Sequence, residues 1–125
     1  MTLEEEKRYL LLLSSYYCLI NGIEQTKSEV LDTIFNKNWV VLNSSELMIK
    51  HNRAELVWRD DFAFVRKHLV QNGFFDGSVR NRWTITVPHG KDELKRLHSL
   101  AIADRSLNKI TVAAINDGVS LYPFP

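Results

Sequence analysis

Two groups of basic residues in the middle of the chain have the types and spacing needed to bind duplex DNA. One lies on a predicted helix and the other on the turn of a predicted hairpin. A guanidinium group can donate two hydrogen bonds to guanine O6 and N7 in the major groove, and basic side chains on a turn can reach phosphates or the minor groove. The residues predicted to contact DNA are Lys50, Arg53, Arg59, Arg66, Lys67, Arg80, Asn81 and Arg82.

The charge of the chain is unevenly distributed. The 125 residues carry a formal net charge of +1, which by itself argues against a nucleic-acid-binding protein. Residues 1–49 hold four Lys and Arg against seven Asp and Glu, a net of −3, whereas residues 50–82 hold seven against four, a net of +3. The basic excess therefore coincides with the two predicted groups. Exposed helix faces and turns are usually charged, so ordinary surface ion pairs are the alternative explanation.

The helix that carries the first basic group is predicted over residues 54–72, with Gly73 as a left-handed C-cap. Apolar residues at helical spacing define its buried face: Trp58, Phe62, Val65 and Leu69. A β-hairpin is predicted next, over residues 74–87. In its second strand Trp83, Ile85 and Val87 alternate with polar residues, which is typical of a half-buried strand.

The remaining segments are predicted to be mostly helical. Residues 3–21 are predicted to form a helix whose middle is apolar nearly all round, so this helix should lie centrally. The other expected elements are a helix that begins at Thr26 in a capping box with Glu29, a helix start at Asn43-Ser44-Ser45-Glu46, a helix over Lys91–Ala103 with Leu94, Leu97, Leu100 and Ala101 inward, and a last strand that could lie in Leu107–Ile115.

This order of elements predicts an α+β chain of the winged helix-turn-helix class. It consists of three helices, a β-hairpin wing and a C-terminal helix, with an additional strand if Leu107–Ile115 forms one. Residues 1–106 are expected to form the winged helix-turn-helix domain, and residues 107–125 a C-terminal strand and tail that could dimerise. Order alone is a weak criterion, because many small α+β domains share it.

Residues 9–100 resemble the N-terminal winged-helix domain of Mrr-type restriction endonucleases. The resemblance is carried by Trp58 early in the basic helix, by the helix end Leu69-Val70-Gln71-Asn72-Gly73-Phe74-Phe75, and by the wing strand Arg82-Trp83-Thr84-Ile85-Thr86. It implies a DNA-binding module whose helix 58–72 and wing 76–82 face DNA. Such wings often have Gly before the Trp, where this chain has Arg82. No counterpart of the family's nuclease domain is present, so the resemblance implies binding and not cleavage.

The sequence offers little support for catalysis. Glu93-Leu94-Lys95 has the Glu-x-Lys spacing of metal-dependent nucleases, but it falls in a predicted helix and not on a strand. His51, His68, His89 and His98 form no H-x-x-x-H pair, and no glycine-rich phosphate-binding loop occurs. We therefore expect no enzyme activity, no metal site and no small-molecule cofactor.

The single cysteine, Cys18, cannot form a disulfide within one chain, so a reducing cytoplasmic compartment is expected. Cys18 lies in the apolar run Tyr9–Ile20, whose 12 residues fall short of the ~20 that cross a bilayer, so no membrane partner is expected.

The leading expectation from the sequence is a non-catalytic protein that binds double-stranded DNA, either as a transcriptional regulator or as the targeting module of a restriction or defence system. The alternative is a winged-helix adaptor that binds proteins, forms a homodimer and does not bind DNA. An exposed strand edge at Ile110–Ile115 would suit such a dimer.

Overall fold

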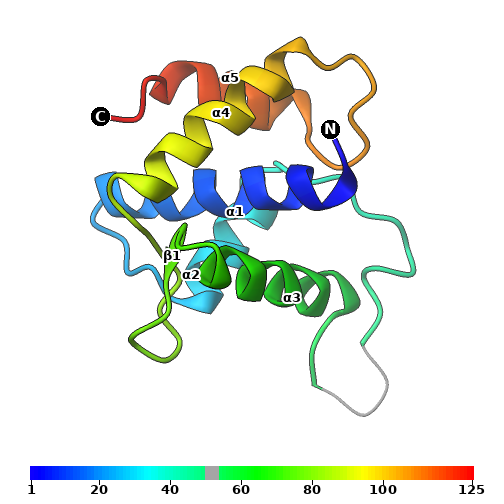
Figure 1. The fold of residues 1–125 in the computed structure, drawn as a ribbon. Coiled ribbons are helices and arrows are strands. Elements are labelled where there is room, and N and C mark those ends of the chain that lie inside the picture. Colours follow the sequence, from blue (N-terminus) through cyan, green and yellow to red (C-terminus); the bar gives the residue numbers. More distant parts are fainter. Residues whose placement is uncertain (50–53) are drawn as a thin grey trace.

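A computed structural model describes residues 1–49 and 54–125. The described part is α+β and holds five helices and one two-stranded antiparallel hairpin (Figure 1). None of the helices in these two ranges is long and apolar enough to cross a membrane. In chain order the elements are α1 (Leu3–Ile20), α2 (Lys27–Asn36), α3 (Val57–Gln71), β1 (Phe75–Asp76), β2 (Thr84–Ile85), α4 (His89–Ala103) and α5 (Val112–Leu121).

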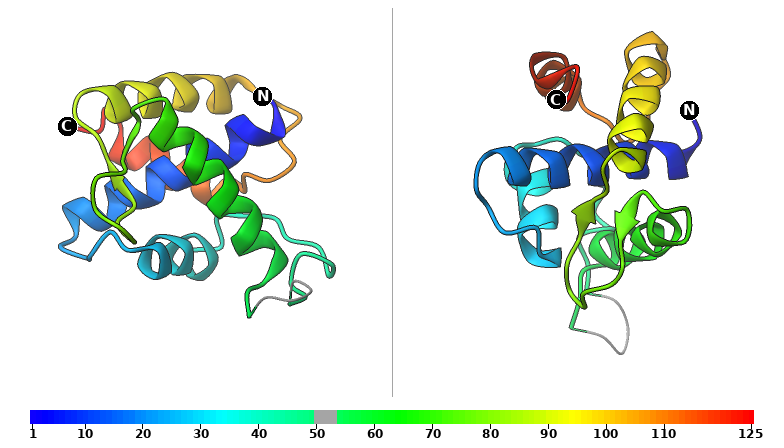
Figure 2. Two further views of the ribbon diagram at one scale, coloured as in Figure 1. Left: turned by 60° about the horizontal axis from the view of Figure 1, so that its bottom comes forward. Right: turned by 60° about the vertical axis from the view of Figure 1, so that its left-hand side comes forward.

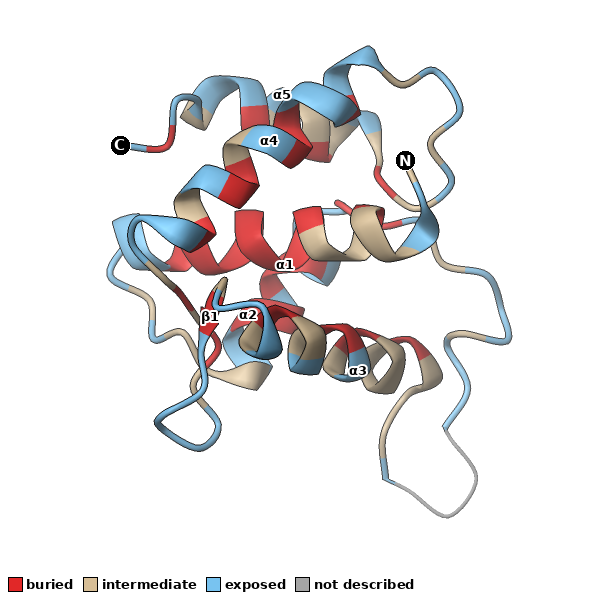
Figure 3. Ribbon diagram, viewed as in Figure 1, coloured by how far each residue is buried: buried red, intermediate tan, exposed pale blue. Residues whose placement is uncertain are grey.

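Helix α1 forms the centre of the molecule, as its apolar sequence predicts. The pair α2 and α3 lies on one side of it and the pair α4 and α5 on the other (Figures 1 and 2). Residues 9–16 of α1 are all buried (Figure 3). A capping box starts the helix, because Thr2 Oγ1 accepts from the Glu5 amide and the Glu5 carboxylate accepts from the Thr2 amide.

The predicted buried stripe of α3 is confirmed. Its four buried residues are Trp58, Phe62, Val65 and Leu69. Gly73 follows the helix at φ +77°, a conformation that favours glycine, and the Phe74 amide donates to the Leu69 carbonyl. The stripe therefore fixes which side of α3 faces α1.

The hairpin is present but its strands are only two residues long, with Phe75 opposite Ile85 and Asp76 opposite Thr84. Trp83 and Ile85 are buried as predicted. Val87 is 67% exposed, so its predicted inward position is wrong. The Thr86 amide donates to the Phe74 carbonyl and is the last group of the hairpin to pair. The chain then turns at Pro88 into α4, so Val87 lies outside the hairpin and the alternation does not reach it.

The linker between α1 and α2 runs beside the hairpin. Thr26 forms an antiparallel bridge with Arg82, and the Trp83 amide donates to the Gln25 carbonyl at 2.6 Å. Thr26 also begins α2 as predicted, since its hydroxyl accepts from the Glu29 amide. The linker thereby holds the second half of the hairpin, at Arg82 and Trp83, against the helical core.

The helix predicted to start at Asn43 is wrong. Asn43 and Glu46 do cap each other, but the residues that follow form a turn. The carbonyls of Glu46 and Met48, which a helix would need for its own ladder, instead accept from the amides of Trp58 and Val57 at the start of α3. The turn therefore leads the chain into α3.

The last predicted strand is also wrong. Only Ile110 pairs, in an isolated bridge with Val40, and α5 begins immediately afterwards because the Thr111 hydroxyl accepts from the Ala114 amide. Ile110 is buried, so the exposed strand edge proposed for a dimer does not exist there. Residues 110–112 are all β-branched, which favours a strand. Thr111 is nevertheless the N-cap of α5, and strand propensity does not take capping into account.

Helix α4 begins two residues earlier than predicted, at His89, because Thr86 Oγ1 accepts from the Gly90 amide. Leu94, Leu97 and Ala101 are buried as predicted, whereas Leu100 is 40% exposed and its predicted inward position is wrong. Residues 107–125 pack on the core. The buried Glu6 carboxylate accepts from the amides of Asn108, Lys109 and Ile110, and Phe124 is buried.

Candidate nucleic-acid interface

The predicted DNA-contacting residues that the structure describes come from α3 and the hairpin, which lie with α2 on one side of α1. The left-hand view of Figure 2 brings this side forward. The turn of the hairpin projects beside the C-terminal end of α3 (Figure 1). Gly77 in that turn lies against α3, since a Cβ there would come 2.4 Å from Val70 Cγ1. Helix α3 therefore sets the position of the turn.

Arg59 is held in an ion-pair network at the N-terminal half of α3. Its guanidinium lies 2.9 Å from Asp32 on α2 and 3.3 Å from Glu55, and Glu55 also pairs with Lys27 at 2.7 Å. The side chain of Arg59 is only 18% exposed and covers the Trp58 ring. The charges of Asp32 and Glu55 thus neutralise those of Arg59 and Lys27. The i,i+4 spacing of Glu55 and Arg59 in the sequence is the signal that predicts this pairing.

Arg66 joins α3 to the hairpin. Its Nη2 donates to the backbone carbonyl of Arg82 at 2.9 Å, and its guanidinium lies over the Trp83 ring at 5.8 Å. Its Nε is buried without a hydrogen-bond partner in the described part of the chain. Burial lowers the pKa of Arg66 below its usual value. Arg66 therefore has a structural role, since it connects α3 to the hairpin. The position of Arg66 in the helical pattern of the sequence does not reveal this role.

Three other predicted cations have no ion pair with any described residue: Lys67, Arg80 and Arg82. Lys67 and Arg80 are exposed, and Arg82 is half-buried beside the Arg66 contact. Asn81, also exposed, adopts a left-handed conformation at φ +63°, which Asn tolerates better than most residues. Lys50 and Arg53 lie outside the described residues. The side chains presented to solvent are thus those at the C-terminal half of α3 and on the hairpin turn.

An acidic cleft occupies the opposite flank of α3, where it meets the start of α1. The cleft is about 380 Å³ in volume, and its lining residues are Glu4, Lys7, Asp60, Asp61, Phe64 and Val65. His68 contacts the Glu4 carboxylate across the same two helices. The carboxylates here would repel phosphates, so they limit a DNA-facing region to the other end of the helix.

The Glu-x-Lys pair lies on α4, as its helical setting predicts. The Glu93 carboxylate is buried and accepts from Arg96 Nε and Nη2 at 2.6 and 2.9 Å, so Arg96 and not Lys95 is its partner. Across residues 1–49 and 54–125 no group of three or more His, Cys, Asp or Glu is arranged to hold a metal ion. Cys18 is buried, and desolvation raises its pKa.

No protein-family model matches the chain, and no curated protein or solved structure matches it either.

Proposed function

We propose that this chain is a small winged helix-turn-helix protein that binds duplex DNA without catalysing a reaction on it. The observation that carries the proposal is a set of cations on α3 and the hairpin that have no ion pair with any described residue: Lys67, Arg80 and Arg82. Helix α3 would serve as the reading helix and the hairpin as the wing. The Thr26–Arg82 bridge supports this reading, because it adds a third strand-like segment beside the hairpin.

The charges favour backbone contact over base-specific readout. Arg59 and Arg66, the guanidinium groups best placed on the sequence for guanine, are engaged within the protein. The remaining cations lie where a wing and a helix end reach phosphates. Binding of this kind is weak and salt-sensitive. It suits a cytoplasmic transcriptional regulator, or a targeting module of a restriction or defence system that gains specificity from a partner.

The test is fluorescence anisotropy with a labelled random-sequence duplex over a series of salt concentrations. Lys67, Arg80 and Arg82, together with Lys50 and Arg53, predict a log–log salt slope between about −3 and −4.5. Each of Lys67→Gln, Arg80→Gln and Arg82→Gln is expected to reduce that slope by about 1. The matched control is Arg105→Gln, which removes one charge from the exposed segment after α4. No binding at micromolar protein and low salt would refute the proposal.

A protein-binding role is the second candidate, and one observation favours it. Five large apolar side chains in residues 35–49 are exposed by 45–68%: Phe35, Val41, Leu47, Met48 and Ile49. Phe35, Val41 and Leu47 line one shallow cleft, and exposed apolar side chains that lie together often mark a protein interface. Light scattering after size exclusion distinguishes the two candidates. A dimer that Met48→Lys converts to a monomer, together with no DNA binding, would favour the adaptor.

A further inference from the structure

A cleft between α4 and α5, on the side of α1 away from the proposed DNA-binding face, has the features of a small-molecule site. Its volume is about 310 Å³, and it is lined by His98, Ser99, Ile102, Val119 and Tyr122. Small-molecule sites are typically about 300–1,000 Å³, mostly apolar, with a few polar groups that fix orientation. This cleft is at the lower end of that range, which suits a ligand with one ring.

His98 supplies a buried polar group to the cleft wall. The residue is 3% exposed, and its ring stacks on Tyr9 at 5.9 Å and on Tyr122 at 5.4 Å between centroids. Nδ1 lies 2.8 Å from Tyr9 Oη, whereas Nε2 has no hydrogen-bond partner in the described part of the chain. Gly118 permits this packing, because a Cβ there would lie 2.1 Å from Tyr9 Oη.

The direction of the Tyr9–His98 hydrogen bond follows from the surroundings of the phenol. Burial raises the pKa of Tyr9 far above its usual value, so the hydroxyl keeps its proton. Tyr9 Oη has no other partner among the described residues, so that proton is satisfied only by donation to Nδ1. Burial also lowers the pKa of His98, which keeps the ring neutral. The imidazole hydrogen is then on Nε2, which becomes a hydrogen-bond donor.

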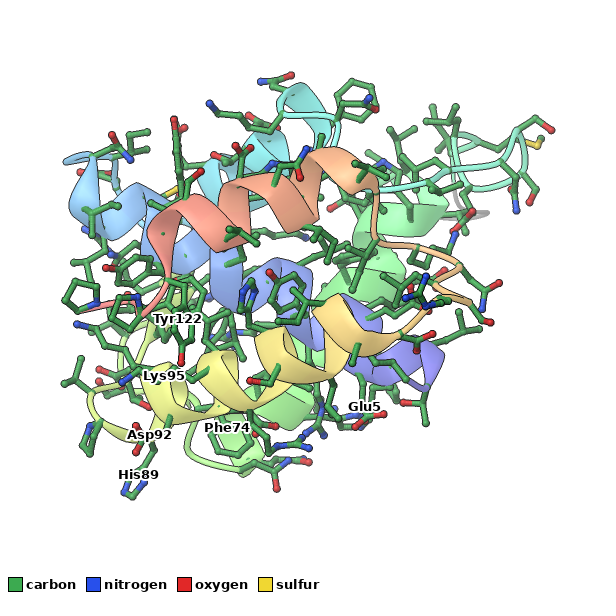
Figure 4. The ribbon with its side chains drawn as sticks, turned by 90° about the horizontal axis from the view of Figure 1, so that it is seen from above. Glu5, Phe74, His89, Asp92, Lys95 and Tyr122 are labelled. Atoms are coloured by element: carbon green, nitrogen blue, oxygen red, sulfur yellow. The ribbon has the colours of Figure 1, made fainter. Side chains whose placement is uncertain are left out.

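Besides His98, the cleft is lined by the polar Ser99 and by three larger side chains that are mostly apolar, and one cation lies outside the lining. Ile102, Val119 and Tyr122 are 55%, 56% and 51% exposed, which is unfavourable unless something covers them. Lys95 lies one turn before Ser99 on the same face of α4 and has no ion pair with any described residue. Figure 4 looks down on α4 and α5 and labels Lys95 and Tyr122 at this end of the helix pair.

We propose that this cleft binds a small aromatic carboxylate. Its ring would pack against Tyr122 between Ile102 and Val119, and its carboxylate would accept hydrogen bonds from His98 Nε2 and Lys95 Nζ. An aromatic ring suits Tyr122, whose ring packs nearly parallel to His98 and is half exposed. A carboxylate suits one donor in the lining, His98 Nε2, together with one charged donor a turn before Ser99 on the same face of α4.

The test is an NMR titration of the full ¹⁵N-labelled chain with sodium benzoate. We expect saturable shifts confined to amides of residues 95–102 and 118–122, with a dissociation constant on the order of 1 mM, as befits so small a probe. Lys95→Gln should weaken benzoate binding about threefold, the effect of losing one partly exposed charge. Arg105→Gln, which removes an equal charge past the end of α4, should leave the affinity unchanged.

A neutral probe separates the carboxylate from the ring. Benzyl alcohol should bind more weakly than benzoate to the native chain and equally well to the native chain and Lys95→Gln. Shifts that do not saturate, that map to other residues, or that give the same benzoate affinity in Lys95→Gln would overturn the proposal. The dispersion of each variant's spectrum shows whether it is folded, so loss of binding through unfolding is recognised directly.

Discussion

Arg66 Nη2 on α3 donates a hydrogen bond to the backbone carbonyl of Arg82 in the hairpin, across 2.9 Å. The same guanidinium covers the Trp83 ring, so one side chain joins the helix to both the backbone and the buried aromatic just before β2. A two-residue strand pair has little stability of its own. The position of the hairpin turn, and of the cations on it, therefore depends on Arg66.

Arg66→Met should destabilise the protein, because it keeps most of the apolar stem but removes the donor and the cation over Trp83. A hydrogen bond from a charged group contributes about 1.5–3 kcal/mol. We expect the free energy of unfolding in urea to fall by about 1–3 kcal/mol. Lys67→Gln, the exposed neighbour, should change it by less than about 0.5 kcal/mol. Equal stability of the two variants would mean that Arg66 has no structural role.

Glu6→Gln should cost more than Arg66→Met. The buried Glu6 carboxylate accepts from three consecutive amides, including Lys109 at 2.7 Å and Ile110 at 3.1 Å. All three amides donate to Oε1, and Asn108 also reaches Oε2 at 3.2 Å. An amide side chain removes the negative charge that these N–H groups stabilise and places an N–H group at the Oε2 position, opposite the Asn108 amide. We expect a loss of about 3 kcal/mol or more in the free energy of unfolding. Glu24→Gln, at an exposed site, is the matched control and should leave stability nearly unchanged.

The release of residues 108–110 can be followed separately from global stability. Hydrogen exchange of these amides should accelerate in Glu6→Gln more than exchange in the middle of α1. Uniform acceleration across the chain would mean that the carboxylate supports the whole fold and does not hold this loop in particular.

The helices with one continuous apolar stripe are predictable from the sequence. Trp58, Phe62, Val65 and Leu69 define the buried face of α3, because one period relates all four. The N-cap of a helix is equally predictable where a helix does follow it, as Thr26 shows at the start of α2. At Asn43 the same capping pattern leads into a turn, since the carbonyls of Glu46 and Met48 bond the start of α3. These carbonyls could bond either within a local helix or to the start of α3. The residues around Asn43 alone do not show which of the two forms.

The candidate DNA interface is predictable in its location and less so in its chemistry. The sequence identifies the basic residues and places them on the helix and the turn. It does not reveal that Asp32, on another helix, pairs with Arg59, or that Arg66 points at the Arg82 carbonyl. The α4–α5 cleft has no sequence signature at all, because Tyr9, His98 and Tyr122 meet only through the fold.

Gly118→Ala tests the packing behind the α4–α5 cleft. In a helix interior Ala is normally more stable than Gly by about 0.5–1 kcal/mol. Here the new Cβ would lie 2.1 Å from Tyr9 Oη and 3.0 Å from His98 Nδ1, so the Tyr9–His98 hydrogen bond has to move. We expect the opposite sign, a loss of about 1–3 kcal/mol in the free energy of unfolding. Ser120→Ala, exposed on the same helix, is the control. A stabilised Gly118→Ala variant would contradict this packing.

His98 should make stability depend on pH in a defined direction. Burial lowers its pKa below the usual 6.5, so the folded chain binds its proton less readily than the unfolded chain does. The contribution of the neutral ring is complete above pH 6.5. It is lost as the pH falls from there toward the lowered folded-state pKa, by at most about 1.4 kcal/mol per pH unit. His98→Gln removes this dependence, so the stability difference between the native chain and the variant should narrow below pH 6.5. Urea unfolding of both at pH 8, 7, 6 and 5 measures it, and a difference that stays constant over that range would mean that His98 does not titrate as its burial requires.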